Sequence, residues 1–585
     1  MNKIKVFENI EILENINAEC NILKEEKGKN IFEYTFNLKW NEDEAKKSDL
    51  NGVEIRFTVP IIDAAHLWTP NCRTKRFLDA EWRTKNQTMM TVGAPVACVF
   101  NEDEKNRYTF ASSETKKITS LEVGVDEHSA NLFAKLKIGL GQYTNKNEHT
   151  VKILLIEDDM PYSDALNTVC TWWEDVCNIF PMKVSESAKM PVYSSWYNFH
   201  QHITDEKIEK ECVYANELGL KSIIVDDGWQ TDDTNCGYAF CGDWEVTPSK
   251  IKDMKAHVEN VHKAGLKYIL WFSIPFVGYK SKAWERFKNK IIYKIDRLNA
   301  GVLDPRYPDV REYLISIYEN ALKNYNLDGF KLDFIDRFLI VDENNITDEM
   351  DYVCVQEAAD KLMTDVKERL TAIKEDILIE FRQSYIGPDM RKYANMFRVN
   401  DCPCDFVSNR IGICDLRLLS GNTAVHSDML MWNDNETSQN AAKQILNCIF
   451  GVIQLSKKLE FMKENHKKMA KFWIDFAIKN KDVLLSSSFY AYEPQNLYPV
   501  VKAFDEKEEI TAVYAKNKII NPDLSKNVKI VNATSDDVIY LKSDVKKDIN
   551  ICVKTCEGEI SFEGKVSLCE GVNTLNVPVS GLIEF

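Results

Sequence analysis

The sequence predicts an α/β fold class in which a (β/α)8 barrel is flanked by two β-sandwiches. Residues 1–180 are strand-like until a helical pattern appears near their end, which indicates an N-terminal β-sandwich plus a linker helix. Residues 181–482 alternate short apolar runs with amphipathic helices, as parallel β/α units do. Residues 483–585 return to short strands between polar turns, which favours a small C-terminal β-sandwich.

The N-terminal strands are recognised by their alternation of apolar and polar residues. It is clearest over 31–38, 53–59 and 132–138, and a period of two is typical of strands with one buried face. The pattern becomes helical over 162–177, and two prolines then bracket a connector before the next domain.

The central segment contains eight β/α units, and about 290 residues suit a barrel of this kind with a few long loops. The predicted strands are 192–197, 222–226, 268–272, 329–334, 377–382, 397–400, 423–426 and 452–455. The predicted helices are 205–218, 251–264, 310–325, 353–373, 438–450 and 464–479. The C-terminal strands are expected over 500–504, 510–514, 528–531, 538–542 and 549–553.

The amino-acid composition narrows the classes of partner that the chain is expected to bind. Lys and Arg number 74 against 90 Asp and Glu, and the net charge of −16 argues against a nucleic-acid partner. No apolar run approaches the roughly 20 residues that a membrane span needs, and the start has no signal-peptide core. Sixteen cysteines without paired Cys-x-x-Cys motifs fit reduced thiols. We therefore expect a cytoplasmic protein with no membrane partner and no structural metal.

Acidic residues follow three of the predicted barrel strands. Asp226 and Asp227 follow strand two, Asp333 ends strand four and Asp401 follows strand six. Each alone would be read as the N-cap of the next helix, but three together favour a site, because the carboxyl ends of barrel strands form the active-site mouth.

Two basic residues lie beside these acids. Lys331 and Asp333 are two residues apart and point to the same side of a strand, where the cation would keep the carboxylate ionised. Arg398 is close enough to Asp401 to position it, although a structural salt bridge would give the same pattern.

Two facing carboxylates are the minimum equipment of a glycosidase, and Asp333 and Asp401 fit the nucleophile and the acid/base. Asp226 and Asp227 would accept hydrogen bonds from sugar hydroxyls. Nearby tryptophans, among them Trp229 and Trp271, would offer faces for stacking.

The chain resembles glycoside hydrolase family 36, the α-galactosidase group whose clan includes family 27. The resemblance rests on Asp226-Asp227-Gly228-Trp229 and on Lys331-Leu332-Asp333, and it extends over nearly the whole length because that family has the same three-part fold.

The resemblance implies a role for each matching residue. Asp333 would be the nucleophile, Asp401 the acid/base, Lys331 a hydroxyl contact, and the Asp pair would hold hydroxyls 4 and 6 of a galacto-configured ring. Trp196 would be a pocket wall on strand one. Trp68 would reach the sugar from the first sandwich, unless it packs in a core.

Three departures from the family pattern leave the sugar open. The Cys-Ser-Gly-Gly stretch after strand five is replaced by a segment that contains Arg382, which could read the sugar's 2-position or an anionic group. The Trp-x-Glu-Pro-Glu stretch after strand three is replaced by Trp271-Phe-Ser-Ile-Pro. The altered acid/base segment makes Asp405 a second candidate for the acid/base.

The sequence therefore predicts a retaining α-glycosidase, most like an α-galactosidase, that acts on an oligosaccharide or glycoside without a cofactor. An α-N-acetylgalactosaminidase or a glycosyl transferase at the same site stays open, as does a homo-oligomer. The alternatives of another class are a metal-dependent barrel hydrolase, for which His200 and His426 are the only histidines near strand ends, and a non-catalytic carbohydrate-binding protein.

Overall fold

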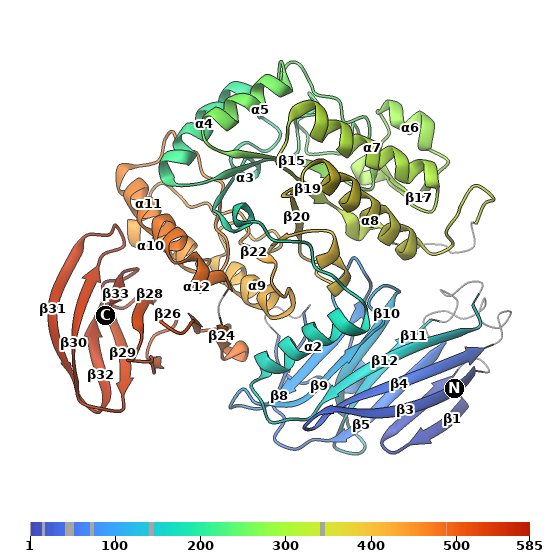
Figure 1. The fold of residues 1–585 in the computed structure, drawn as a ribbon, viewed down its shortest axis with the longest axis horizontal. Coiled ribbons are helices and arrows are strands. Elements are labelled where there is room, and N and C mark those ends of the chain that lie inside the picture. The colour runs from blue at the N-terminus through green and yellow to red at the C-terminus, as the bar shows by residue number, and fades with distance from the viewer. Residues whose placement is uncertain are drawn as a thin grey trace.

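The computed structural model describes residues 2–14, 18–40, 52–70, 75–139, 146–339, 346–486 and 488–585. Figure 1 shows three parts: an N-terminal β-sandwich in blue, a central β/α domain from green to orange, and a C-terminal β-sandwich in red. This is the predicted architecture. Within the described segments, no helix is long and apolar enough to cross a bilayer.

The N-terminal domain consists of two six-stranded sheets, in the orders β1-β2-β5-β11-β10-β7 and β3-β4-β12-β9-β8-β6. The alternation of the sequence explains the core: along β4, Phe36, Leu38 and Trp40 are buried and alternate with more exposed residues. The strands are β1 (Asn2–Phe7), β2 (Ile10–Glu14), β3 (Ala18–Gly28), β4 (Ile31–Trp40), β5 (Val53–Pro60), β6 (His66–Trp68), β7 (Gln87–Thr88), β8 (Val96–Phe100), β9 (Asn106–Ser112), β10 (Thr119–Asp126), β11 (Asn131–Ile138) and β12 (Glu148–Ile156).

Helix α2 (Tyr162–Val176) joins this sandwich to the barrel. Its two adjacent tryptophans are buried with their indole N–H groups satisfied by the sandwich: Trp172 donates to Glu33 at 2.7 Å and Trp173 to the Ser112 carbonyl at 2.9 Å. The Trp pair therefore anchors the linker helix to the first domain.

The barrel is a sheet of eight parallel strands in the order β22-β21-β20-β19-β15-β14-β13-β23. A parallel bridge between His426 and Val452 brings β22 to the segment before β23, so the sheet nearly closes. The strands are β13 (Val192–Ser194), β14 (Ser222–Val225), β15 (Lys267–Ser273), β19 (Gly329–Asp333), β20 (Leu378–Arg382), β21 (Met396–Arg398), β22 (Ala424–His426) and β23 (Gln454–Leu455).

All eight predicted strands are present, but strand one ends at Ser194 and Trp196 opens the short helix α3 (Trp196–Phe199) instead. A three-stranded sheet and a helix inserted after β15 were not predicted; they are β16 (Phe276–Gly278), α6 (Lys282–Phe287), β17 (Ile291–Ile295) and β18 (Ala300–Leu303).

The barrel helices surround the strands. Six of them match predicted helices to within a few residues at each end: α4 (Asp205–Leu218), α5 (Met254–Lys263), α7 (Pro308–Tyr325), α8 (Val355–Ile373), α10 (Ser438–Leu446) and α11 (Glu464–Lys479). Helix α9 (Phe406–Leu419) was not predicted from the sequence, and it follows β21 and precedes β22 in the chain.

The C-terminal domain pairs a seven-stranded sheet with a three-stranded one. Helix α12 (Lys481–Ser486) leads into it, so the predicted boundary at residue 483 falls inside this helix. The strands are β24 (Ser488–Tyr492), β25 (Val500–Phe504), β26 (Glu508–Val513), β27 (Ile519–Ile520), β28 (Asn527–Asn532), β29 (Val538–Ser543), β30 (Lys547–Lys554), β31 (Ile560–Leu568), β32 (Gly571–Asn576) and β33 (Leu582–Glu584).

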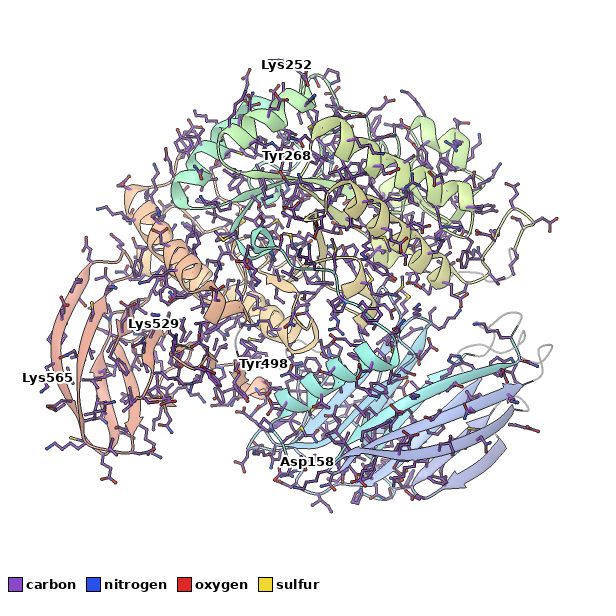
Figure 2. All side chains as sticks on the ribbon, viewed as in Figure 1. Asp158, Lys252, Tyr268, Tyr498, Lys529 and Lys565 are labelled. Carbon is purple, nitrogen blue, oxygen red and sulfur yellow. The ribbon has the colours of Figure 1, made fainter. Side chains whose placement is uncertain are left out.

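A buried polar cluster ties the three domains together. Arg76 of the first sandwich donates to both carboxylate oxygens of Asp415 on α9, at 2.8 and 2.9 Å. Tyr498 of the last domain donates to Asp415 at 2.6 Å, and Trp68 does so at 3.1 Å. Tyr498 is labelled in Figure 2 at the point where the three domains meet. Trp68 is therefore a buried interdomain residue.

This cluster should carry a large share of the interdomain stability. Replacing Arg76 with Met leaves the Asp415 carboxylate buried beside neutral donors only, so we expect the free energy of unfolding to fall by about 3–5 kcal/mol. Urea unfolding followed by tryptophan fluorescence measures it. Lys282→Met is the matched control, because its ion pair with Glu245 is exposed and should contribute little to stability. A loss in Arg76→Met no larger than in the control would contradict the role of the cluster.

Candidate active site

The predicted acidic residues come together at the carboxyl ends of the barrel strands. Asp333 is the last residue of β19, and Asp226 and Asp227 directly follow β14. Lys331 donates to Asp226 at 2.6 Å, and both side chains are buried, so this pair bridges two strands that flank β15. Burial alone would lower the pKa of Lys331, but Asp226 raises it above its usual value, which keeps the ammonium charged.

Asp333 is a buried carboxylate with an unequal set of hydrogen bonds. Its Oδ1 accepts three: from Arg382 Nε at 2.8 Å, from the Tyr385 hydroxyl at 2.7 Å and from the Phe334 backbone N–H at 2.8 Å. Its Oδ2 accepts one long bond of 3.2 Å from the Trp271 indole. Oδ1 is thus fixed, whereas Oδ2 has the lone pairs that a nucleophile needs.

The charges around Asp333 decide its protonation. Burial would raise its pKa, but Arg382 and Lys331 together outweigh burial and hold the pKa well below its usual range. Asp333 is therefore ionised at any physiological pH.

Asp401 lies in the loop after β21 and has a different environment. Its side chain is 53% exposed, and Arg398 donates to its Oδ1 at 3.0 Å. Partial burial and the charge of Asp333 raise its pKa, whereas Arg398, Lys331 and Arg382 lower it, and the net pKa is below the usual value. Arg382 also donates to Asn400 at 3.2 Å, so one guanidinium contacts both Asp333 and the residue before Asp401.

Asp405 has a structural role. It is the N-cap of α9, where its Oδ1 accepts from the Ser408 backbone N–H at 3.0 Å and its Oδ2 from the Ser408 hydroxyl at 2.6 Å. Because capping occupies both oxygens, the geometry favours Asp401 over Asp405 as the acid/base.

Asp227 is the most deeply buried of the unpaired acids at this rim. It accepts hydrogen bonds from Gln201 at 2.6 Å and from Gln230 at 2.7 Å. Burial nevertheless raises its pKa to about 6. Gly228 makes this contact possible: its φ is +117°, and a Cβ there would lie 2.6 Å from the Gln201 Cα.

Most of the tryptophans that were expected to contact the sugar are buried in the structure. Trp229 is fully buried, stacks on Trp244 and donates to the Trp271 carbonyl at 2.9 Å, so it has no free face for a sugar. Trp271 is also buried and reaches the site only through its indole N–H. Trp68 lies in the interdomain cluster, where its indole N–H is taken by Asp415. Trp196 alone is partly exposed, with its ring edge-on to His200.

Several residues of this site were not predicted from the sequence. Asp428 follows β22 and contacts Arg398, a strand-end signal like the other three. Tyr385, Gln201 and Gln230 come from loops, where no periodicity marks them. Tyr238, also from a loop, stacks on Trp271, and its hydroxyl has its pKa raised by burial and by Asp227 and Asp333.

The histidines near strand ends make no metal site. His426 is buried, bonds to the Ala188 carbonyl at 2.8 Å and has its pKa lowered to about 4 by burial. Across the described residues, no group of three or more His, Cys, Asp or Glu side chains has the arrangement of a metal site. The donor set gives a metal-dependent hydrolase no support.

The chain is similar in sequence to a known family and to known proteins. Residues 160–413 match the family model Melibiase. The α-galactosidase Mel36A of Lactobacillus acidophilus is 25% identical over 201 residues, which are 33% of this chain and 26% of that protein. α-Galactosidase AgaA of Geobacillus stearothermophilus is 26% identical over 148 residues, which are 24% of this chain and 20% of that protein. The chain thus aligns with about a quarter of the length of these relatives.

Solved structures extend the likeness to the whole fold. The crystal structure of AgaA in complex with raffinose has a TM-score of 0.69 at 14% identity, over 100% of this chain and 84% of that one. The galactosidase domain of AgaSK, an α-galactosidase-sucrose kinase, has a TM-score of 0.66 at 12% identity, over 100% of this chain and 83% of that one. The predicted fold class and the resemblance to glycoside hydrolase family 36 are confirmed.

The raised pKa of Asp227 predicts a pH-dependent stability. Between about pH 4 and pH 6 the folded chain holds a proton on Asp227 that the unfolded chain has released, so this carboxyl lowers stability as pH rises, by roughly 3 kcal/mol in total. Asp227→Asn removes the titration. The difference in free energy of unfolding between variant and wild type should therefore shift in favour of the variant from pH 4.5 to pH 7, as measured by urea unfolding. A difference that is constant with pH would show that Asp227 is ionised throughout.

Proposed function

We propose that the chain is a retaining α-glycosidase that removes terminal α-linked sugars, most like an α-galactosidase. The observation that carries the proposal is the pair Asp333 and Asp401: a buried, ionised carboxylate with one lightly bonded oxygen, and a half-exposed carboxyl on the same rim. The family match and the α-galactosidases among its relatives support this reaction type.

In the first step, Asp333 Oδ2 attacks the anomeric carbon and the bond to the leaving oxygen breaks. Asp401 transfers its proton to that oxygen. Asp401 must carry a proton at this stage, although Arg398 lowers its pKa in the free chain. A bound sugar that displaces water from its exposed face, together with the nearby charge of Asp333, raises that pKa.

In the second step, Asp333 is esterified and Asp401 is deprotonated. Once Asp333 is an ester it no longer carries a negative charge, so the pKa of Asp401 falls and its carboxylate can accept a proton from water. The hydroxide formed attacks the anomeric carbon, the glycosyl–Asp333 bond breaks and Asp333 leaves as a carboxylate. Two displacements at one carbon retain its configuration.

The rest of the site would bind the sugar. Asp226 and Asp227 accept hydrogen bonds from its hydroxyls, Lys331 and Arg398 contact it at their free N–H groups, and Trp196 and Tyr238 contribute aromatic contact. The AgaA structures with raffinose and stachyose support an oligosaccharide substrate. Arg382 and Tyr385 stand beside the nucleophile, next to the sugar's 2-position. This leaves α-N-acetylgalactosaminides and transfer to a second sugar as variants of the same chemistry.

The location proposed for this activity is the cytoplasm. Eight cysteines in the described part of the chain are buried free thiols, as is usual in a reducing compartment.

Substitution of the two proposed catalytic acids tests the reaction. Asp333→Ala should abolish turnover of p-nitrophenyl α-galactoside, because no covalent intermediate can form. Asp401→Ala should still release the good leaving group in a burst but slow the second step by about 10²–10⁴-fold, the usual range for general acid–base catalysis. Asp405→Ala is the matched control and should retain turnover. Unchanged rates in both acid variants would end the assignment.

A panel of aryl α-galactoside, α-N-acetylgalactosaminide and α-glucoside, assayed with and without EDTA, identifies the sugar in the same experiment. Loss of activity with EDTA would favour a metal-dependent enzyme instead.

Arg382 should set the acid limb of the pH profile. Arg382→Met removes the main cation that lowers the pKa of Asp333, so the pKa rises and the acid limb of kcat/KM moves to higher pH by about 1–3 units. Tyr385→Phe removes one hydrogen bond and should move it in the same direction by less. A wild-type acid limb in Arg382→Met would show that Asp333 does not depend on this guanidinium.

A further inference from the structure

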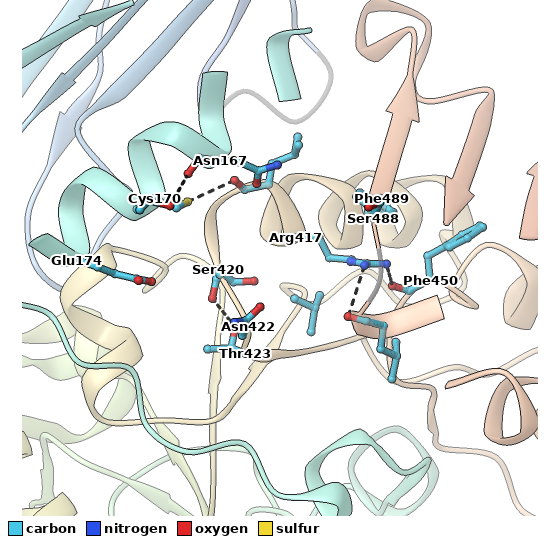
Figure 3. A pocket seen from close by; sticks show the side chains of 15 residues that line it. Asn167, Cys170, Glu174, Arg417, Ser420, Asn422, Thr423, Phe450, Ser488 and Phe489 are labelled. Carbon is cyan, nitrogen blue, oxygen red and sulfur yellow. Dashed lines mark hydrogen bonds between the residues drawn. The ribbon is translucent and has the colours of Figure 1, made fainter. Parts of the chain in front are cut away.

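A cavity of about 310 Å³ lies at the amino ends of the barrel strands, opposite the candidate active site. It is bounded by α2, by the end of α9 with the turn into β22, and by β24 of the C-terminal domain (Figure 3). We name it the Arg417 cavity. Its walls are mostly polar side chains, including Asn167, Thr171, Ser420 and Asn422.

Arg417 brings a cation to this cavity without a carboxylate partner. Its guanidinium donates to the carbonyls of Phe450 at 3.0 Å, Leu484 at 2.6 Å and Leu485 at 3.4 Å, and stacks 3.8 Å above the Phe489 ring. No carboxylate of the described residues forms an ion pair with it, and burial lowers its pKa to about 10. Arg417 is half-buried, and a charge that is partly removed from water is stabilised by a partner of opposite charge.

The carbonyl contacts orient the guanidinium but leave part of its hydrogen-bonding capacity unused. They occupy three of its five N–H groups and leave Nε–H and one Nη2–H without a partner in the described structure. Two free N–H groups of one guanidinium can donate to two oxygens of an oxyanion.

Ser420 contributes a second unused donor. Its side chain is 5% exposed, its hydroxyl has no hydrogen-bond partner, and it lines the same cavity. It follows Arg417 by three residues at the end of α9, so the two side chains lie on the same side of the helix. Buried hydroxyls are nearly always bonded, and an orphan beside an unpaired cation points to a ligand.

Among the described residues that line the cavity, Glu174 is the one acid, and its charge is already neutralised. Glu174 accepts a hydrogen bond from Arg391 at 2.9 Å, and Arg391 is itself buried. Gly421 permits this contact: its φ is +59°, and a Cβ there would lie 2.5 Å from Arg391 Nη1. Two arginines and one glutamate leave the neighbourhood with a charge of about +1.

We propose that the Arg417 cavity binds a small oxyanion of the phosphate type, held by the free N–H groups of Arg417 and by the Ser420 hydroxyl. The site is separate from the acids at the carboxyl ends of the strands, so the proposal does not rest on the proposed function. Because its walls come from all three parts of the fold, the bound ion would link them and stabilise the whole chain.

Titration of the full chain with inorganic phosphate and, separately, with glycerol phosphate tests the proposal, with chloride at equal ionic strength as the reference. We expect a saturable heat in calorimetry and a rise of Tm that chloride does not produce. Binding of the free ion, or of the ester alone, supports the proposal and distinguishes inorganic phosphate from a phosphorylated metabolite. Absence of saturable binding for both overturns it.

Two variants assign the binding to the cavity. Arg417→Met should abolish it, and Ser420→Ala, which keeps the packing should the arginine variant fail to fold, should weaken Kd by about fivefold to tenfold. Ser525→Ala, an exposed serine of the C-terminal sandwich, is the matched control and should bind as the wild type does. A wild-type Kd in Ser420→Ala and in any folded Arg417→Met overturns the site.

Discussion

Three cations in the barrel mouth, two of them buried and one half-buried, determine its geometry and its protonation. Lys331 pairs with Asp226, Arg382 pairs with Asp333, and Arg398 pairs with both Asp401 and Asp428. Without them, desolvation would protonate the buried acids and the strand ends would repel one another. The same contacts hold Asp333 ionised, bring the residue before Asp401 to the same guanidinium and fix β14 against β19. Charge pairing thus sets both the geometry and the protonation of the site.

Helix α9 joins this mouth to the rest of the molecule. It begins at the Asp405 cap, directly after the segment that carries Asp401. Asp415, nearer its far end, anchors the cluster that joins all three domains, and Arg417 and Ser420 at its end line the cavity below the barrel. A single helix therefore spans from the proposed acid/base to the junction of the domains, and its position depends on buried polar contacts at both ends.

The sequence revealed much of this because the informative signals are local. Alternation identified the sandwich strands, and acids placed at the ends of apolar runs identified Asp226, Asp227, Asp333 and Asp401, which the fold brings to one rim. What it missed depends on packing between distant segments. Trp229 has the same neighbours in the chain whether it faces a sugar or a core, and only the stacking of Trp244 decides between them.

Helix α9 was not predicted from the sequence, for a related physical reason. Arg410 and Asp415 are on its buried side, bonded to other domains, so its polar residues do not mark the solvent face as they do in an ordinary amphipathic helix. Loop residues such as Tyr385 and Gln201 carry no periodic signal at all, and their contacts with Asp333 and Asp227 exist only in the folded chain.

The unequal accessibility of the two proposed catalytic acids has a kinetic consequence. Asp401, open to bulk solvent over half of its surface, can exchange its proton directly with the medium between catalytic cycles and requires no relay of side chains to reset. Asp333 is buried, and Arg382, Tyr385 and Trp271 hold its oxygens by hydrogen bonds. The proposed acid/base thus exchanges its proton with the solvent, whereas the proposed nucleophile is buried away from it.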